Sequence, residues 1–375
     1  MLARVEEVRL AERLIAHDTS DSAGLAVATD FVAGWLEGRG AEVTRRTYGD
    51  HEVLLAQAGD GPVRIVFHGH LDVVPGRDDQ FIPRVDGNRL FGRGAYDMKA
   101  ALGAMMLATC DLVARPPDGA TVEFVMVPDE ECAHPGANAS EMLVADGLRA
   151  DLVVCGEPTD MQVGVQAKGV LILSIEVEGR AAHGSTPWLG DNAVMRALEV
   201  YRRIESLPFT NASTPMFARP SVNLGRIAGG DAVNKVPDSC HMDVDIRYLP
   251  GQDPEEILRQ VREAGPSHVE VSISRPPADT DPDHPLVTAL ISAASAYDDC
   301  TTSVGRNGAS DAVAFLEVGV PAVEFGPHGA GHHGPDEYVD LPSLIGYRRA
   351  LVDFAHAAGV LAPLIAMHRG RVAGS

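Results

Sequence analysis

VRIVFHGHLDVV, residues 63–74, is a short apolar run that ends in polar side chains, and we expect it to form a strand. Runs of the same kind predict further strands at 51–57, 121–127 and 151–155. Helical spacing of apolar residues predicts helices at 4–16, 22–38 and 98–114. Strands that alternate with helices indicate an α/β domain with a largely parallel sheet.

Helices and strands also alternate in the last third of the chain. Helices are expected there at 286–297, 310–317 and 341–357, and a strand at 321–325. The middle differs, because apolar and polar residues alternate in its strands. Its expected order is strand 170–179, helix 192–206, strands 221–228 and 240–249, a helix opening at Asp253, and strand 269–274. This β-α-β-β-α-β order is typical of a ferredoxin-like domain. We therefore expect an α/β domain of residues 1–168 and 286–375, interrupted by an inserted α+β domain at 169–285.

Composition limits the possible partners. The 375 residues include 31 Lys and Arg against 53 Asp and Glu, so the net charge is −22. This balance disfavours nucleic acid and anionic membranes as partners. The N-terminus has no signal-peptide core, and no apolar window approaches the roughly 20 residues of a membrane span. Five cysteines, odd in number and far apart, are typical of a reducing compartment. We expect a cytoplasmic protein.

Polar side chains gather where the expected strands end, and ligands of open α/β sheets collect at that edge. His70 and Asp72 close the strand at 63–74, and side chains two apart share one face. A carboxylate often stands behind a metal-bound histidine and fixes its orientation. Taken alone, a pair in a polar loop would explain them as well.

Four further sites follow the same rule. Asp97 begins the helix at 98–114, where it would also serve as an N-cap. Asp129, Glu130 and Glu131 end a strand, and adjacent carboxylates repel one another unless a cation or proton intervenes. The remaining sites are Glu157, after the strand at 151–155, and His328, His332 and His333, after the strand at 321–325.

Together the five sites supply two histidines and three carboxylates. Mixed nitrogen and oxygen ligands suit zinc, or alternatively cobalt or manganese. Two metals need about five to six protein ligands, one of them a bridging carboxylate. The inventory fits two divalent ions.

Eight motifs occur in order along the chain: HGHLDVVP, GRGAYDMKA, PDEE, GEPT, GRAAHGSTP, GGDAVNKVPDSCHMDVDIR, GASDA and HHGPDEYV. They resemble the motifs of the metallopeptidase family of acetylornithine deacetylase, succinyl-diaminopimelate desuccinylase, aminoacylase and glutamate carboxypeptidase. The resemblance spans about residues 5–357. It implies a zinc-peptidase-like catalytic domain interrupted by a ferredoxin-like lid, which also dimerises.

The resemblance implies metal ligands at five positions. His70 and Glu157 would bind one metal, Glu131 and His333 would bind the other, and Asp97 would bridge them. The family spacing His-x-Pro-x-Glu selects His333 over its neighbour His332, and His-x-Asp selects His70 over His68.

Other positions are expected to support catalysis. Asp72 would orient His70, and Glu130 would be the general base. His183 resembles the family histidine that crosses from the partner subunit to stabilise the oxyanion, which implies a homodimer. His134 departs from the family's small, glycine-rich residues and would either narrow the site or face solvent.

Four residues are expected to bind substrate: Lys168, Asn234, Arg247 and Ser310. An ion pair with Asp243 or Asp245 is an equal alternative for Arg247, as is a hinge ion pair for Lys168. Ser310 lies outside a G-x-S-x-G elbow, so we reject a serine hydrolase.

The activity implied is removal of an acetyl or succinyl group from an N-acyl amino acid such as acetylornithine or succinyl-diaminopimelate. Two divalent ions, zinc first, would activate the attacking water. A dipeptidase or carboxypeptidase of the same family is the alternative. A metal-binding regulatory protein without activity is disfavoured, because every ligand position and the base are present.

Overall fold

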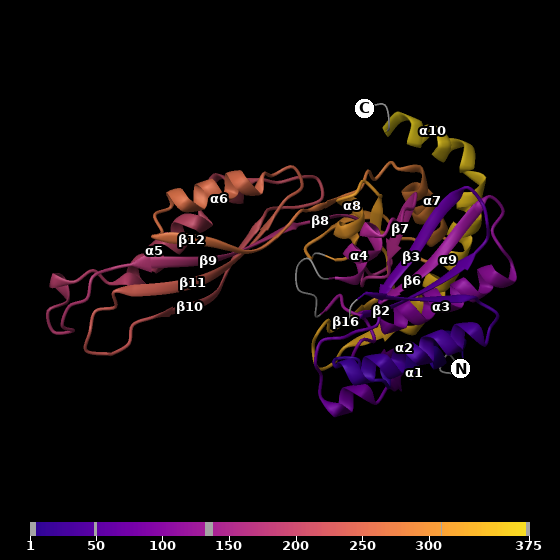
Figure 1. Ribbon diagram of the computed structural model, residues 1–375, viewed down its shortest axis with the longest axis horizontal. Coiled ribbons are helices and arrows are strands. Elements are labelled where there is room, and N and C mark those ends of the chain that lie inside the picture. The colour runs from indigo at the N-terminus through magenta and orange to yellow at the C-terminus, as the bar shows by residue number, and fades with distance from the viewer. Residues whose placement is uncertain (1–4, 49–50, 132–137, 309, 373–375) are drawn as a thin grey trace. The chain divides into compact units, whose positions relative to one another are not determined.

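The structure, a computed structural model, describes residues 5–48, 51–131, 138–308 and 310–372 (Figure 1). The chain divides into two compact units. The first unit comprises Met1–Val165, Thr280–Val304 and Ser310–Ser375, and the second comprises Gln166–Asp279 and Gly305–Ala309. The second unit is therefore inserted in the first along the sequence.

Four parallel strands form the centre of the large sheet, in the order β6-β3-β7-β15. Their bounds are β6 Ala120–Val127, β3 Val63–His70, β7 Leu152–Cys155 and β15 Ala322–Glu324. Antiparallel strands extend the sheet on both sides. These are β1 Val43–Tyr48, β2 His51–Ala58, β8 Val163–Ala167 and β13 Ala278–Asp279, with β14 Ser303–Arg306 also paired to β8. The prediction of an α/β fold with a largely parallel core is confirmed.

Helices cover the large sheet on both faces. α3 (Lys99–Ala114) and α9 (Leu341–Val360) pack on β3 and β6, and α1 (Glu6–Ile15) packs on α3. α4 (Ala139–Ala145) and α8 (Ala312–Leu316) contribute Leu143 and Phe315 to the apolar cluster on the other face. The remaining helices are α2 Ser22–Glu37, α7 Pro285–Ala294 and α10 Ala362–Val372. Burial of these apolar faces against the sheet is the main stabilising contribution in this unit.

A small antiparallel sheet brings two distant loops of the first unit together. Its order is β16-β17-β5-β4, with bounds β16 Gly329–Ala330, β17 Tyr338–Asp340, β5 Arg89–Phe91 and β4 Arg84–Asp86. Tyr338 pairs with Phe91, so the loop between β16 and β17 lies beside the segment that leads into α3. These two- and three-residue strands were not predicted from the sequence.

The second unit is a four-stranded antiparallel sheet in the order β10-β11-β9-β12, with α5 and α6 packed on one face (Figure 1). The bounds are β9 Gly169–Glu178, α5 Ala193–Glu205, β10 Ser221–Gly229, β11 Ser239–Tyr248, α6 Pro254–Glu263 and β12 His268–Arg275. Alternating residues such as Leu173, Ile175, Val244 and Ile246 are buried beneath the helices. The expected β-α-β-β-α-β order is confirmed.

Some predicted bounds were wrong. The strand expected at 63–74 ends at His70, because the chain then leaves the sheet and the carboxylate of Asp72 binds backbone amides instead. The helix expected at 310–317 covers only Ala312–Leu316. Ala278–Asp279, for which no strand was expected, pairs with β8 as strand β13. Local composition could not reveal these tertiary contacts.

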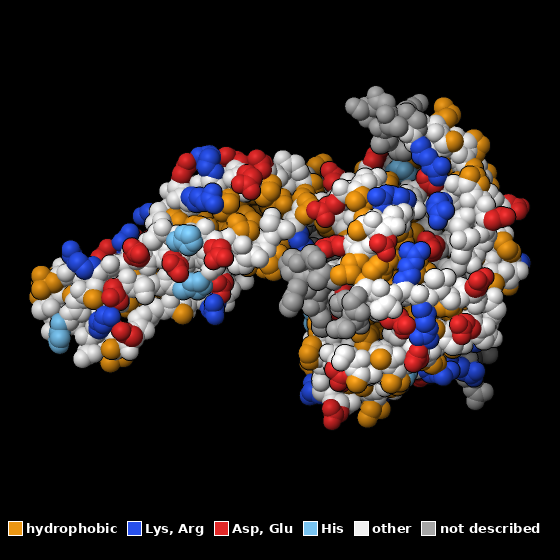
Figure 2. Space-filling model, in the orientation of Figure 1, with side chains coloured by type: hydrophobic (Ala, Val, Ile, Leu, Met, Phe, Trp, Pro, Cys, Tyr) orange, Lys and Arg blue, Asp and Glu red, His pale blue; other side chains and the backbone are white. Residues whose placement is uncertain are grey.

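The surface mixes both signs of charge. In the view of Figure 2, acidic and basic side chains are interspersed over the described residues of both units. None of the described helices is long and apolar enough to cross a membrane.

Candidate metal centre

Three neighbouring parallel strands deliver the first candidate ligands to one edge of the sheet. His70, the last residue of β3, is opposite Val127, the last residue of β6, and Glu130 and Glu131 follow β6. Glu157 follows β7 on the other side of β3. Because parallel strands end at the same edge, the three segments converge. Ligand atoms of His70, Glu130 and Glu131 lie within 4.8 Å of one another.

Asp97 lies at the centre of the cluster. Its Oδ1 is 3.1 Å from His70 Nε2, while its Oδ2 is 3.4 Å from His333 Nε2 and also contacts His332 Nε2. Although burial opposes it, the hydrogen bonds from these three imidazoles hold the pKa of Asp97 well below its usual range. The N-cap of α3 is Met98, so the alternative role of Asp97 as an N-cap is wrong.

Glu131 and His333 form the other side of the cluster. His333 Nε2 is 2.8 Å from Glu131 Oε1, and the two carboxylates Asp97 and Glu131 raise the pKa of His333 to about 10. Ligand atoms of His70, Asp97 and Glu157 form a second group within 4.8 Å. The other four residues expected to bind metal are thus brought together around Asp97.

Asp72 joins two strands of the cluster. Its Oδ1 accepts the backbone N–H of Glu130 at 3.1 Å, and its Oδ2 accepts that of Glu131 at 2.8 Å. Its Oδ1 also lies 3.4 Å from His70 Nδ1, which is 3.0 Å from the backbone carbonyl of Asp72. One side chain therefore contacts His70 and also the loop that carries Glu130 and Glu131.

The donor set has the chemistry of a cation site. Burial, together with Asp97 and Glu130, raises the pKa of Glu157 well above its usual range. Burial likewise raises the pKa of Glu130, with Asp311, Asp97 and Glu131 adding to the shift against the effect of His70. Crowded buried carboxylates beside imidazoles are relieved by a divalent ion, and this mixture of ligands fits zinc.

A buried ion pair is hydrogen-bonded to the backbone of Asp97 and His333. Arg93 Nη1 is 2.7 Å from Glu337 Oε2, and both side chains are almost fully buried. Glu337 Oε1 accepts the backbone N–H groups of Tyr96 and Asp97, and Arg93 Nη2 donates to the backbone carbonyl of His333. Glu337 was expected only as part of a motif and Arg93 was not expected in the site, because the two partners lie 244 positions apart in the sequence.

A second buried hydrogen-bond network includes His68, which lies two residues before His70 in β3. Ser140 Oγ donates to Asp311 Oδ2 at 2.7 Å and accepts from His68 Nε2 at 2.8 Å, while Asn138 Nδ2 donates to Asp311 Oδ1. Burial lowers the pKa of His68 to about 4, so the ring is neutral. Asp129 is used structurally as well, because its carboxylate accepts the backbone N–H of Ala139 at the start of α4.

In the inserted unit, His183 and Asn234 lie side by side. Gly184 N–H donates to the backbone carbonyl of Asn234, and His183 forms a β-bridge with Lys235. His183 Nδ1 is 2.8 Å from Ser185 Oγ, and the imidazole is exposed.

The two basic residues expected to bind substrate have different surroundings. Arg247 makes a bidentate ion pair with Asp245, at 2.8 and 3.1 Å, which is the alternative its strand pattern had indicated. Lys168 has no carboxylate partner among the residues the structure describes. Its Nζ lies 5.7 Å from the centre of the Phe217 ring, and burial lowers its pKa, with Arg219 and Arg247 adding to the shift.

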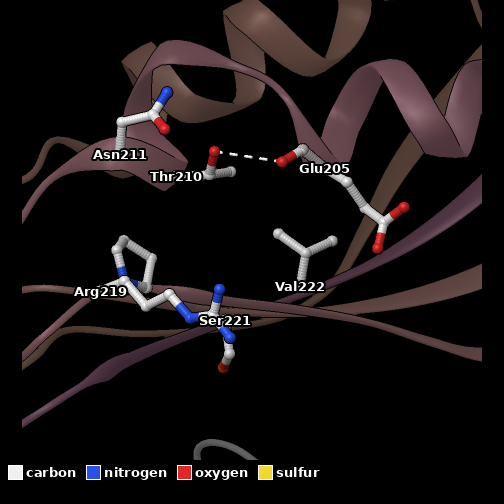
Figure 3. Close-up of a pocket in the computed structure, with 7 residues that line it drawn as sticks. Glu205, Thr210, Asn211, Arg219, Ser221 and Val222 are labelled. Atoms are coloured by element: carbon white, nitrogen blue, oxygen red, sulfur yellow. Dashed lines mark hydrogen bonds between the residues drawn. The ribbon is translucent and has the colours of Figure 1, made fainter.

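A surface hollow of about 410 Å³ also belongs to the inserted unit (Figure 3). Its lining includes Glu205, Thr210 and Arg219, and Thr210 Oγ1 donates to the backbone carbonyl of Glu205 at 3.1 Å. The lining holds one carboxylate and no histidine or cysteine, so it does not offer the ligands of a metal centre.

Ser310 is buried in the first unit, and its Oγ donates to Glu324 Oε1 at 2.7 Å. His134, for which the sequence left two roles open, lies outside the described residues.

An α/β unit with an inserted ferredoxin-like unit, and a cluster of imidazoles and carboxylates at the sheet edge, define the class of metal-dependent hydrolases. The profile of peptidase family M20/M25/M40 matches residues 66–357, and the chain belongs to this family.

The chain is similar in sequence to three curated relatives. The chain is 29% identical to a succinyl-diaminopimelate desuccinylase of Erythrobacter litoralis, over 93% of this chain and 97% of the relative. It is also 29% identical to an acetylornithine deacetylase of Klebsiella pneumoniae, over 87% and 89% of the two chains. A probable carboxypeptidase of Aspergillus terreus is 35% identical over 59% of this chain and 55% of its own length.

Solved structures share the fold. The aminopeptidase PepT of Bacillus cereus superposes with a TM-score of 0.77 at 20% identity, over 94% of this chain and 97% of that chain. The metallo-carboxypeptidase Sso-CP2 of Sulfolobus solfataricus, of the M20 family, has a TM-score of 0.77 at 18% identity, over 95% of this chain and all of that chain.

Proposed function

We propose that the chain is a two-metal amidohydrolase that removes an acetyl or succinyl group from an N-acyl amino acid, such as acetylornithine or succinyl-diaminopimelate. The observation that carries the hydrolase assignment is the position of Asp97, whose two carboxylate oxygens face His70 and His333 respectively. The substrate class is supported by the desuccinylase and deacetylase relatives, which match almost the whole chain.

In this proposal His70 and Glu157 would hold one divalent ion, Glu131 and His333 would hold the other, and Asp97 would contribute to both sites. Zinc is the proposed metal, with cobalt or manganese as alternatives. Such ions, when bound, polarise the scissile carbonyl and lower the pKa of water to about 7.

Glu130 is proposed as the general base. It would take a proton from the attacking water and return it to the nitrogen of the departing amine. Burial raises its pKa above the usual carboxyl range, and this is the direction that strengthens a general base. Asp72 would hold the backbone of Glu130 in place through the hydrogen bond from its N–H.

The inserted domain, with predicted bounds 169–285, is proposed to act as a lid and dimerisation domain. His183 of one subunit would donate a hydrogen bond to the oxyanion formed in the partner's site, a contribution of roughly 2.7–4 kcal/mol in comparable oxyanion sites. Lys168, Asn234, Arg247 and Ser310 are proposed to bind substrate. Lys168 is proposed to bind a carboxylate of the substrate. This role is supported by two nearby arginines and by the lack of an acidic partner for Lys168 among the described side chains.

A dipeptidase or carboxypeptidase is the second candidate. It is supported by the carboxypeptidase relative, which has the higher identity over a shorter match.

A cytoplasmic location is proposed from the thiols Cys110, Cys155, Cys240 and Cys300, which are all free.

A hydrolysis panel tests the proposal. The purified protein, supplied with zinc or cobalt, is assayed for release of free amine from acetylornithine, succinyl-diaminopimelate, other N-acyl amino acids and dipeptides. The proposal expects kcat/KM to be highest for an acetyl or succinyl substrate. Highest activity on a dipeptide would favour the second candidate, and no hydrolysis of any amide with metal bound would contradict both.

A further inference from the structure

Two successive histidines occupy the centre of a tight turn in the loop between β16 and β17. Gly334 N–H donates to the carbonyl of Gly331 at 2.6 Å, which closes a four-residue turn with His332 and His333 in the middle. His333 has a φ of 56°, the sign required at the third position of a type II turn. In an extended chain, successive side chains would point to opposite sides. The turn instead allows both imidazoles to reach the same neighbour.

The turn is held in this unfavourable conformation by the surrounding structure. A non-glycine residue with positive φ costs about 1–3 kcal/mol, and such strain persists where contacts over-determine it. Arg93 donates to the carbonyl of His333 at 3.1 Å, and Gln80 Nε2 donates to that of Gly334 at 3.1 Å. The turn is thus fastened on both sides.

Both imidazoles meet at one atom. His332 Nε2 and His333 Nε2 each approach Oδ2 of Asp97, and the three ligand atoms lie within 4.8 Å of one another. The two rings have centroids 4.1 Å apart, and Tyr96 meets the His332 ring edge-on at 6.5 Å. The side chain of His332 therefore faces the cluster, although about half of it is exposed.

We propose that His332 is a fourth protein ligand of the second metal, together with Asp97, Glu131 and His333. This inference rests on the two-metal site of the proposed function. Three protein ligands and one water are typical of a catalytic zinc, whereas four protein ligands are typical of a closed, structural one. The second site would then be closed and bind its ion more tightly. The first site, with His70, Glu157 and Asp97, would keep the open position.

The test compares metal binding by the full-length protein with that of His332→Ala. The two stepwise dissociation constants for zinc are measured by competition with a chelating indicator, and the cobalt-loaded proteins are compared by visible absorption. We expect the tighter constant to weaken by at least about 10–100-fold, the loss typical even of residues that only orient a ligand. We also expect the cobalt bands to shift, because water would replace an imidazole. His328→Ala is the matched control, since His328 Nε2 binds Asp298 Oδ2 at 2.5 Å instead of Asp97.

X-ray absorption of the zinc-loaded wild-type protein gives a second readout that needs no variant. The inference expects three imidazoles shared by two zinc ions. It is overturned if only two are found, or if His332→Ala retains both constants and the cobalt spectrum. Wild-type protein that binds no metal would overturn the proposed function as well, so the two failures are distinguishable.

Discussion

The carboxylate of Asp72 accepts the backbone N–H of Glu131 at 2.8 Å, although the two residues lie 59 positions apart. The other oxygen of Asp72 accepts the N–H of Glu130 and approaches His70 Nδ1. The end of β3 and the loop after β6 are therefore joined through one buried side chain. The position of the proposed base and of two proposed ligands depends on it.

Asp72→Asn should loosen this junction. The substituted amide presents an N–H₂ group to one of the backbone donors, which leaves a buried donor unsatisfied. We expect zinc affinity to fall about 10–100-fold, as for other residues that orient ligands. Chelator competition measures the loss, with Asp86→Asn, in an exposed pair with Arg84, as the control. Unchanged zinc affinity would show that Asp72 does not orient the cluster.

Glu130→Gln should separate catalysis from metal binding. The amide cannot take up a proton, so kcat should fall by about 10²–10⁴-fold. Both metals should remain bound, because Glu130 is outside the proposed ligand set. Turnover and metal content are measured on the same samples, with Glu317→Gln as an exposed control. Retention of wild-type kcat would refute the base assignment.

Glu337→Gln should destabilise the first unit. Removing one charge of the buried Arg93–Glu337 pair leaves the guanidinium without its counter-charge, which typically costs about 3–5 kcal/mol. Zinc affinity should also fall, since Glu337 accepts the N–H of Asp97. Urea unfolding measures the free energy. A loss below about 1 kcal/mol, the range of surface ion pairs, would contradict the structural role.

His68 should make stability depend on pH on the acidic side. Its pKa is lowered from 6.5 to about 4 by burial, so between these values the unfolded chain binds more protons than the folded one. The contribution is fully present above pH 6.5 and is lost as pH falls toward 4, by an amount on the order of 3 kcal/mol. His68→Asn should therefore lose less stability than wild type between pH 7 and 4. Parallel unfolding curves at several pH values measure this, and identical slopes would contradict it.

The sequence predicted much of the sheet and the convergence of the candidate ligands, because both depend on local patterns. Apolar runs marked β3, β6 and β7, and polar residues at their ends marked His70, Glu131 and Glu157. Parallel pairing then brings these ends to one edge. The short strands of the second sheet carry too few residues for a detectable period.

Contacts between residues far apart in the sequence could not be predicted from local sequence patterns. The pairing of Arg93 with Glu337 and the hydrogen bonds from Glu130 and Glu131 to Asp72 depend on how loops meet in space. For Asp97 the local pattern favoured an N-cap, but the three imidazoles around its carboxylate give it a different environment. The turn that points His332 and His333 in the same direction has no clear signal in the sequence beyond its two flanking glycines.

The most direct test of the proposed dinuclear centre is anomalous X-ray scattering at the zinc edge from crystals of the zinc-loaded protein. The proposed centre should give two peaks roughly 3.5–4 Å apart with the carboxylate of Asp97 between them. His70 and Glu157 should lie beside one peak, and Glu131 and His333 beside the other. A single peak, or two peaks that do not share Asp97, would contradict it.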